Sequence, residues 1–203
     1  MLIDLAISGL FGYILGSFPF GLVLVYLATG QDIRTIGSGN IGATNVLRTG
    51  HKGLALLTVV LDALKGAIAF FIVCIWLPQE SGAIAGFGAV VGHCFPVWLR
   101  FAGGKGVATG MAVIAVVVPF GGLVIVATWL FVVAITRLSS LSALLGFFAA
   151  GLFVSFGPFE NSGIAQITVW GVGLLSWARH KQNIQRILKG EENKISFKKK
   201  PSD

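Results

Sequence analysis

Apolar residues dominate the chain in long runs that are separated by short polar segments. A helix needs about 20 apolar residues to cross the hydrocarbon core of a bilayer. By this criterion we predict membrane-spanning helices over residues 3–29, 53–77, 82–99, 107–119, 121–136, 141–158 and 163–179. The sequence therefore predicts an all-α fold, a polytopic membrane helical bundle with seven transmembrane helices.

The stretch 107–136 carries no charge and is interrupted by Pro-Phe-Gly-Gly at 119–122. It fits either one long tilted helix or two short helices joined by a hairpin. With two helices, Arg137 falls on the same side of the membrane as Arg100 and Lys105; with one helix it falls on the opposite side. Cytoplasmic loops are rich in Lys and Arg. The charge pattern therefore favours two helices here, an N-terminus outside and a C-terminus in the cytoplasm.

Positive charge follows this topology almost everywhere along the chain. The 15 Lys and Arg residues lie in alternate gaps between apolar runs, whereas the outer loops at 78–81, 119–122 and 159–162 carry only acidic charge. The exception is Lys65, which lies inside a predicted span with Asp62 three residues before it. Because charge inside a membrane costs a few kcal/mol, we expect these two residues to pair or to face the bundle interior.

Composition supports a membrane protein and excludes several other classes. The 203 residues are 55% hydrophobic and 11% charged, whereas about a quarter of a soluble domain is charged. The net charge of +7 fits loops that face anionic lipid, so we expect no nucleic-acid partner. We predict one membrane domain over 1–190, a basic cytoplasmic tail over 191–203, no disulfide between Cys74 and Cys94, and no metal site.

The first cytoplasmic segment, residues 37–50, reads Gly-Ser-Gly-Asn-Ile-Gly-Ala-Thr-Asn-Val-Leu-Arg-Thr-Gly. It matches the GxGxxG pattern, but no strand precedes it, so it does not indicate a dinucleotide fold. Its glycines allow backbone N–H groups to turn toward an anion. Neutral donors and a forked cation suited to phosphate come from Ser38, Asn40, Thr44, Asn45 and Arg48. The alternative is an ordinary polar turn, but the density of small polar side chains favours an anion site.

Two further segments carry polar residues on the same predicted side. Residues 103–106 read Gly-Gly-Lys-Gly at the start of a span, and a glycine turn that leads into a helix presents N–H groups to an anion. Lys105 adds a full charge there, although a membrane-anchoring lysine is the alternative. After the last span, His180, Asn183 and Arg186 share one face if the helix continues; a solvated basic helix end is the alternative.

Together these segments resemble a known family, the bacterial membrane acyltransferases that use acyl phosphate to acylate glycerol 3-phosphate. The matching pieces, in order and spacing, are residues 37–48, 92–98, 103–109 and 179–186. The resemblance implies an inner-membrane enzyme with a cytoplasmic active site. It implies transfer of a fatty acyl group to the 1-hydroxyl of glycerol 3-phosphate, which gives lysophosphatidic acid and phosphate, the first step of phospholipid synthesis. A soluble partner enzyme would make the acyl phosphate, and no cofactor is expected.

The same resemblance implies roles for individual residues. It ties Ser38, Arg48, Lys105 and Asn183 to glycerol 3-phosphate, and it places His180, Asn40, Thr44, Gly103, Gly104 and Gly106 near the acyl phosphate. We expect Asn45 and Arg186 to bind substrate, and His180, Lys105 and Asn183 to be catalytic. No Ser-His-Asp or Cys-His set is evident, so we expect direct transfer without an acyl-enzyme. Either His180 or a substrate phosphate takes the proton.

A second class of function uses the same residues. A transporter for a small phosphorylated anion would bind its phosphate with the same basic, glycine-rich turns. It would also place polar groups near the bilayer midplane, and apart from Asp62 and Lys65 the predicted spans lack such groups. A purely structural membrane protein leaves the three polar segments unexplained.

Overall fold

A computed structural model describes residues 2–158 and 162–195 of the chain. The described residues form helices and turns and contain no strand, which confirms the all-α prediction. In chain order the elements are α1 (Leu2–Gly16), α2 (Phe20–Thr29), the 3-10 helix η1 (Ile33–Thr35), α3 (Ala43–Arg48), α4 (Lys52–Cys74), α5 (Gln79–Cys94), the 3-10 helix η2 (Val97–Leu99), α6 (Val107–Val117), α7 (Pro119–Thr136), α8 (Ser139–Phe156), α9 (Gly163–Arg179) and α10 (Lys181–Leu188).

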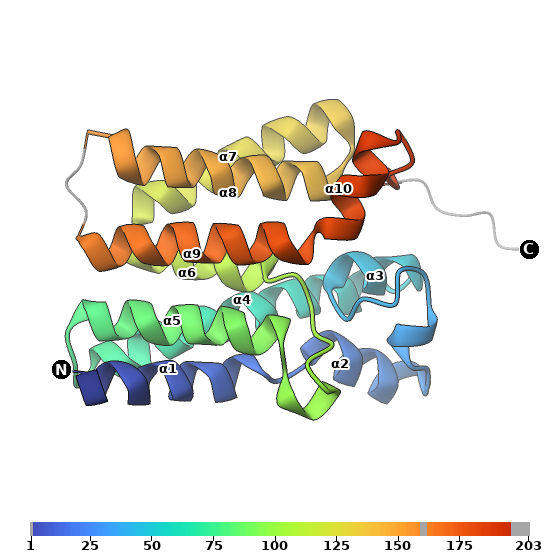
Figure 1. Cartoon of the computed structure of the whole chain (residues 1–203). Helices are drawn as coiled ribbons and strands as arrows, with labels where there is room; N and C mark the ends of the chain where they lie inside the picture. Colours follow the sequence, from blue (N-terminus) through green and yellow to red (C-terminus); the bar gives the residue numbers. More distant parts are fainter. Residues whose placement is uncertain (1, 159–161, 196–203) are drawn as a thin grey trace, which may run out of the picture.

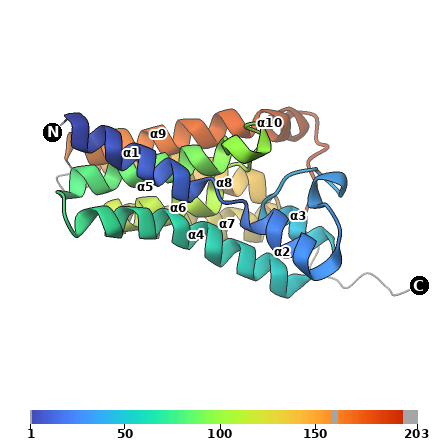
Figure 2. The ribbon, with the colours of Figure 1, turned by 90° about the horizontal axis from the view of Figure 1, so that it is seen from below.

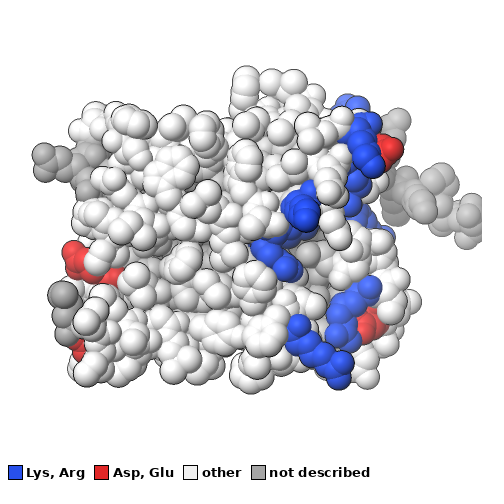
Figure 3. Space-filling view, viewed as in Figure 1, with Lys and Arg blue, Asp and Glu red and all other residues white. Residues whose placement is uncertain are grey.

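The long helices lie side by side along a common axis, with α2, α3, η2 and α10 gathered at one end (Figure 1, Figure 2). We call this the basic end, because on the face shown in Figure 3 the Lys and Arg side chains cluster there. Acidic side chains on that face also lie at the opposite end, near the start of α1. The three polar segments singled out from the sequence therefore meet at one end of an apolar bundle.

Five described segments are long and apolar enough to cross a membrane: Leu2–Thr29, Lys52–Cys74, Gln79–Leu99, Pro119–Thr136 and Ser139–Phe156. The stretch 107–136 forms two helices, α6 and α7, which meet at Val118 and pack against each other. Because α6 has only 11 residues, seven crossings and the sidedness of the termini stay predictions. The tail residues 198–200 and most of the predicted outer loop at 159–162 lie outside the described residues.

The first predicted span is not one continuous helix. Residues 3–29 were expected to form a single segment, but α1 ends at Gly16 and α2 begins at Phe20. Pro19 explains the break, since proline has no backbone N–H to donate and its ring clashes with the preceding turn. The carbonyl of Phe18, released by this break, accepts a hydrogen bond from Lys65 Nζ at 3.0 Å. The break between α1 and α2 thus supplies a hydrogen-bond acceptor for the buried ammonium of Lys65.

Glycines bring α1 and α5 into direct backbone contact, as their small-xxx-small spacing predicts. A Cβ atom on Gly12 would overlap the carbonyl of Ala85, and one on Gly16 would overlap the carbonyl of Ala89. From the other side, a Cβ on Gly92 would overlap the carbonyl of Tyr13. This close packing holds the end of α5 in place. The glycine turn at 103–106 is hydrogen-bonded to that end.

We expect Gly12→Ala to destabilise the bundle by about 1–3 kcal/mol, because the added methyl group forces two helix backbones apart. Gly9→Ala on the same helix is the matched control, since its Cβ would make ordinary contact with Ile84 Cγ2 at 3.5 Å. Thermal unfolding of both variants in detergent measures the difference. Equal melting temperatures would mean that α1 and α5 separate at no cost.

Candidate active site

Asn45 on α3 organises the loop that precedes this helix. The side chain is buried, and its Oδ1 accepts a hydrogen bond from the backbone N–H of Ser38 at 3.0 Å. Its Nδ2 donates to the carbonyls of Ile33 and Ile36 at 3.1 and 2.9 Å. Both amide hydrogens are thus used by the backbone. Asn45 therefore shapes the loop, and its expected contact with substrate stays a prediction.

Ser38 and Arg48 line a cavity of about 420 Å³ together with Gly37, Arg186 and Asn193. Gly37 has a left-handed φ of 55°, and the side chain of Arg48 packs within 3.1 Å of where its Cβ would lie. A larger residue there would disturb both the loop and Arg48. The cavity joins the loop before α3 to α10, so two of the sequence segments meet as expected.

Asn40 and Thr44 belong to the same loop and helix but do not line this cavity. Asn40 Oδ1 accepts a hydrogen bond from the Gly42 backbone N–H at 2.9 Å, which stabilises the turn into α3. Thr44 is exposed on α3. Their predicted contacts with acyl phosphate stay predictions.

The glycine turn before α6 is held from two sides. The backbone N–H groups of Gly103 and Gly104 donate to the carbonyls of Cys94 and His93 at 3.2 and 3.0 Å. Their own carbonyls accept from the guanidinium of Arg179 at 2.9 and 3.0 Å. Because these glycine N–H groups are engaged, the backbone donors that this turn offers to an anion come from Lys105 and the residues after it, which lead into α6 at Val107.

Arg179 is a residue that the sequence did not single out as a site residue, although it lies in the third segment. Besides clamping the glycine turn, its guanidinium carbon lies 5.0 Å from the centre of the Phe95 ring, a distance at which cation and ring attract. The planar fork of an arginine matches two neighbouring carbonyls better than a lysine does. The basic residue at the end of α9 therefore fixes the turn that carries Lys105.

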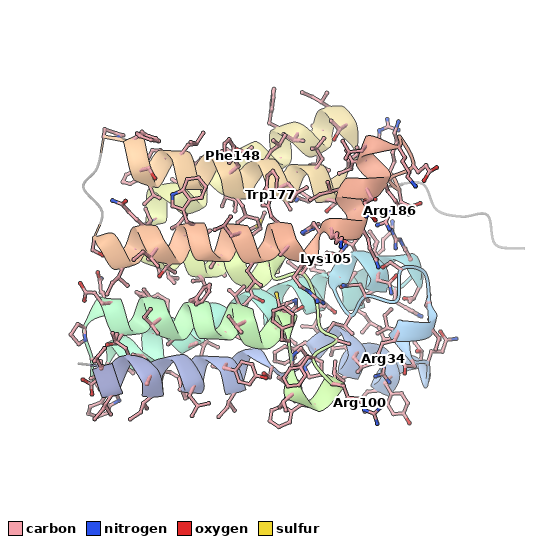
Figure 4. All side chains as sticks on the ribbon, in the orientation of Figure 1. Arg34, Arg100, Lys105, Phe148, Trp177 and Arg186 are labelled. Carbon is pink, nitrogen blue, oxygen red and sulfur yellow. The ribbon has the colours of Figure 1, made fainter. Side chains whose placement is uncertain are left out.

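Lys105 and Asn183, which the resemblance ties to one substrate, contact each other. The ammonium of Lys105 donates to Asn183 Oδ1 at 2.6 Å. Burial lowers the pKa of Lys105 to about 8, while the negative charge of Glu192 acts in the opposite direction. The ammonium is therefore charged at neutral pH but titrates within reach of ordinary assay conditions. Figure 4 shows Lys105 and Arg186 at the basic end.

His180 is buried between α9 and α10, and its tautomer follows from its partner. Nδ1 lies 2.7 Å from the carbonyl oxygen of Ser176, which can only accept, so Nδ1 carries the hydrogen and Nε2 holds the lone pair. Burial lowers the pKa of His180 to about 4, and the charge of Lys105 lowers it further. The imidazole is therefore neutral at pH 7 and in the form that accepts a proton.

A buried polar cluster lies beneath the glycine turn. Lys65 Nζ donates to Asp62 Oδ1 at 2.7 Å and to His93 Nδ1 at 2.9 Å, which confirms the predicted pairing of Asp62 with Lys65. The ring of His93 fills the space where a Cβ on Gly104 would lie. The cluster therefore supports the turn from the membrane side and leaves no room for a side chain at position 104.

The assembled site contains cationic groups and neutral donors at the border between an apolar bundle and water. Four residues of this site were not singled out from the sequence: Arg179, Ser140, Glu192 and Asn193. Ser140 Oγ donates a hydrogen bond of 2.7 Å to Glu192 Oε1. No cluster of three or more metal-ligating side chains occurs in the described part of the chain. The arrangement is suited to binding phosphate groups and stabilising negative charge on phosphate oxygens.

Comparison with known proteins gives a consistent result. Residues 6–190 match the family model described as glycerol-3-phosphate acyltransferase. The chain is 51% identical over 199 residues to the glycerol-3-phosphate acyltransferase of Paramagnetospirillum magneticum, covering 98% of both chains. It is 48% identical over 196 residues to that of Gluconobacter oxydans, covering 95% of this chain and 93% of the relative.

Two solved structures are similar over nearly the full chain. The crystal structure of PlsY (YgiH), an integral membrane glycerol 3-phosphate acyltransferase, in its glycerol 3-phosphate form has a TM-score of 0.87 and 34% identity, with 95% of this chain and 96% of that chain covered. The lysophosphatidic acid form has a TM-score of 0.84 and 33% identity, with 95% of both chains covered.

Proposed function

This chain belongs to the glycerol-3-phosphate acyltransferase family, and from that premise we propose that its acyl donor is acyl phosphate. The fatty acyl group passes to the 1-hydroxyl of glycerol 3-phosphate, which yields lysophosphatidic acid and inorganic phosphate. One observation carries the proposal: at one end of an apolar helical bundle, a cavity with two arginines is linked to the half-buried Lys105 by hydrogen bonds through Asn183 and Glu192. A soluble anion and a lipid-soluble donor can meet only at such a boundary.

Glycerol 3-phosphate fits the cavity between α3 and α10. Arg48 and Arg186 both line it, and a guanidinium offers paired N–H donors that match phosphate oxygens. Ser38 adds a neutral hydroxyl on the same wall. Lys105 donates to Asn183, and Asn183 and Arg186 both donate to Glu192, which places the three donors side by side. These contacts hold the acceptor in one orientation.

Acyl phosphate enters from the bilayer, with its hydrocarbon chain among the apolar helices and its phosphate near the start of α6. Lys105 stands at that position, and the backbone N–H groups that follow it belong to the first turn of α6. The N-terminal end of a helix carries a partial positive charge that favours anions. We assign Gly103 and Gly104 to holding this turn in place, and the donors for the departing phosphate to Lys105 and the helix start.

The chemistry needs no covalent enzyme intermediate. The 1-hydroxyl oxygen attacks the acyl carbon, the bond from that carbon to the phosphate oxygen breaks, and phosphate leaves with the bonding electrons. Holding the two reactants side by side supplies roughly 7–11 kcal/mol of the barrier. Fixed cations at the developing charge supply several kcal/mol more. The hydroxyl proton goes to Nε2 of His180 or to a phosphate oxygen of the substrate.

We expect His180→Gln to lower kcat about a hundredfold, because a positioned base contributes roughly 10²–10⁴-fold. With a pKa of about 4, His180 gives activity that is full at neutral pH and lost as the pH falls through 4. The variant should lose this acid limb. Initial rates from pH 4 to pH 9 measure both effects. A variant with the wild-type rate and profile would transfer the role to a substrate phosphate.

The decisive assay uses purified protein in detergent with synthetic acyl phosphate and labelled glycerol 3-phosphate. We expect labelled lysophosphatidic acid, with no product when acyl-CoA or acyl carrier protein replaces the donor. Product from acyl-CoA alone would overturn the donor assignment. Uptake of label into sealed vesicles without product would instead indicate a transporter.

The setting of the reaction follows from the same proposal. The enzyme is a multi-pass protein of the bacterial inner membrane, with the basic end and the C-terminus in the cytoplasm, where glycerol 3-phosphate is dissolved. A soluble enzyme supplies the acyl phosphate, and the described start of the tail, residues 191–195, lies beside the site. Labelling of a Lys194→Cys variant with a membrane-impermeant thiol reagent, from one face of sealed vesicles, tests this sidedness.

A further inference from the structure

The segment after α10 folds back onto the site. Gly190 adopts a left-handed φ of 73°, which turns the chain sharply, and the Glu191 N–H donates to the carbonyl of Arg186 at 2.8 Å. The Ile195 N–H then donates to the carbonyl of Arg137 at 2.9 Å, at the turn between α7 and α8. Residues 191–195 are thereby held across the basic end, beside α10 (Figure 1).

Glu192 is the residue that this fold-back inserts into the site. Its side chain is only 7% exposed, and its carboxylate accepts three hydrogen bonds from two helices. Oε1 accepts from Ser140 Oγ at 2.7 Å and from Asn183 Nδ2 at 2.5 Å. Oε2 accepts from Arg186 Nε at 2.7 Å. One carboxylate thus ties the start of α8 to two residues of α10.

The contact with Asn183 decides which way its amide points. A carboxylate can only accept, so the NH2 group of Asn183 must face Glu192. The amide oxygen therefore faces Lys105, whose ammonium it accepts at 2.6 Å. Without Glu192 the amide is free to flip and present its NH2 group to the ammonium, which is repulsive. The orientation of Lys105 depends on Glu192 through Asn183.

The contact with Arg186 has a second consequence. Arg186 lines the cavity with Arg48, and two guanidinium groups that share one small space repel each other. The bond from Nε to Glu192 holds Arg186 by one edge and leaves its terminal NH2 groups for another anion. The carboxylate also offsets part of the positive charge that accumulates here before substrate binds.

We propose that Glu192 is a positioning residue that sets the orientation of Asn183 and Arg186 for binding of the phosphorylated acceptor. This inference rests on the proposed function of the cavity and adds a residue to it. The competing role is that of a placeholder: a carboxylate that occupies the phosphate site and must leave when substrate arrives. The two roles predict opposite effects of removing the carboxylate on the affinity for glycerol 3-phosphate.

The test compares Glu192→Gln and Glu192→Ala with Glu191→Gln and Glu191→Ala. Glu191 has the same charge one residue earlier and is exposed, and its side chain makes no hydrogen bond with the described part of the chain. In Glu192→Gln the amide oxygen can still accept from Asn183 and Ser140, but the NH2 group cannot accept from Arg186. We expect KM for glycerol 3-phosphate to rise about tenfold with kcat within about threefold of wild type.

Glu192→Ala removes all three acceptors, so we expect kcat to fall about tenfold as well as KM to rise. Both Glu191 variants should match wild type. A lower KM in either Glu192 variant would establish the placeholder role and overturn the proposal. Glu192 variants that match the Glu191 controls would also overturn it. If Glu192→Ala does not fold, the KM of Glu192→Gln decides.

A pH profile separates positioning from a merely structural role. The charged groups that bear on Lys105 are Glu192, which raises its pKa, and Arg186, Arg48 and Arg179, which lower it; the neutral ring of His180 lies nearby. Glu192→Gln should therefore move the alkaline limb of kcat/KM to lower pH, whereas Glu191→Gln should not. An unmoved limb together with an unchanged KM would refute the inference, while the wild-type enzyme still tests the proposed reaction independently.

Discussion

Lys105→Ala is expected to lower kcat/KM for glycerol 3-phosphate about a hundredfold or more. The ammonium of the half-buried Lys105 donates to Asn183 Oδ1 at 2.6 Å. Removing one fixed donor from the developing charge of an acyl-transfer site costs about 10²–10³-fold in rate. Initial rates with purified protein measure the loss. Lys181→Ala, at an exposed lysine at the start of α10, is the matched control and should retain full activity.

The pH dependence gives this prediction a second, independent measurement. Because phosphate binding needs the charged ammonium, kcat/KM should be constant between the His180 pKa of about 4 and the Lys105 pKa of about 8 and should fall as the pH rises through the Lys105 pKa. Lys105→Arg keeps its charge far above this pH, so its residual activity should lack the alkaline limb. Near-normal activity of the alanine variant, or an alkaline limb that persists in the arginine variant, would reject the role of Lys105.

Asp62→Ala is expected to destabilise the protein by about 3–5 kcal/mol, because it leaves the buried ammonium of Lys65 without its counter-ion. The side chains of Lys65 and Asp62 are only 2% and 5% exposed. The remaining partners of Lys65 are neutral: the Phe18 carbonyl and His93. Thermal unfolding in detergent should show a decrease in Tm on the order of 10 °C.

The control for this second prediction is an aspartate ion pair that is partly exposed to water. Asp32 and Arg34 lie 2.6 Å apart, with side chains 34% and 49% exposed. Asp32→Ala should therefore change stability by no more than about 1 kcal/mol. Equal decreases in Tm for the two aspartate variants would mean that water reaches Lys65 and that the cluster beneath the glycine turn is hydrated.

Charge and hydropathy along the chain predicted that the polar segments gather at one end of the bundle. The hydrogen bond between Lys105 and Asn183, which are 78 residues apart, was beyond that prediction, because a shared membrane face does not determine which side chains touch. The first span was predicted, and Leu2–Thr29 is long and apolar enough to cross a membrane, but the helix break at residues 17–19 within it was missed, although Pro19 is a visible signal for it. The span was assigned from its long apolar run. Hydropathy measures composition and does not register the backbone hydrogen bond that a proline removes.

The sequence did not predict which hydrogen-bond partners individual side chains have. Asn45 has the same character as Asn40 in a pattern of small polar residues, yet its amide is used by three backbone groups of the loop. Glu192 lies in a segment whose charge is typical of a solvated tail, and only the turn at Gly190 brings it back. Both outcomes depend on tertiary contacts between elements that are distant in the chain, which local residue types do not encode.

Because the ring of His93 lies beneath Gly104, the residue types that are tolerated at these two positions depend on each other. The imidazole of His93 packs directly against the turn that carries Lys105. A methyl group at position 104 therefore fits only if a smaller side chain replaces His93. Substitutions at the two sites should therefore show strong epistasis, and homologous chains should exchange the pair together and rarely singly. The position of the charge that faces water thus depends on the size of one side chain in the interior of the bundle.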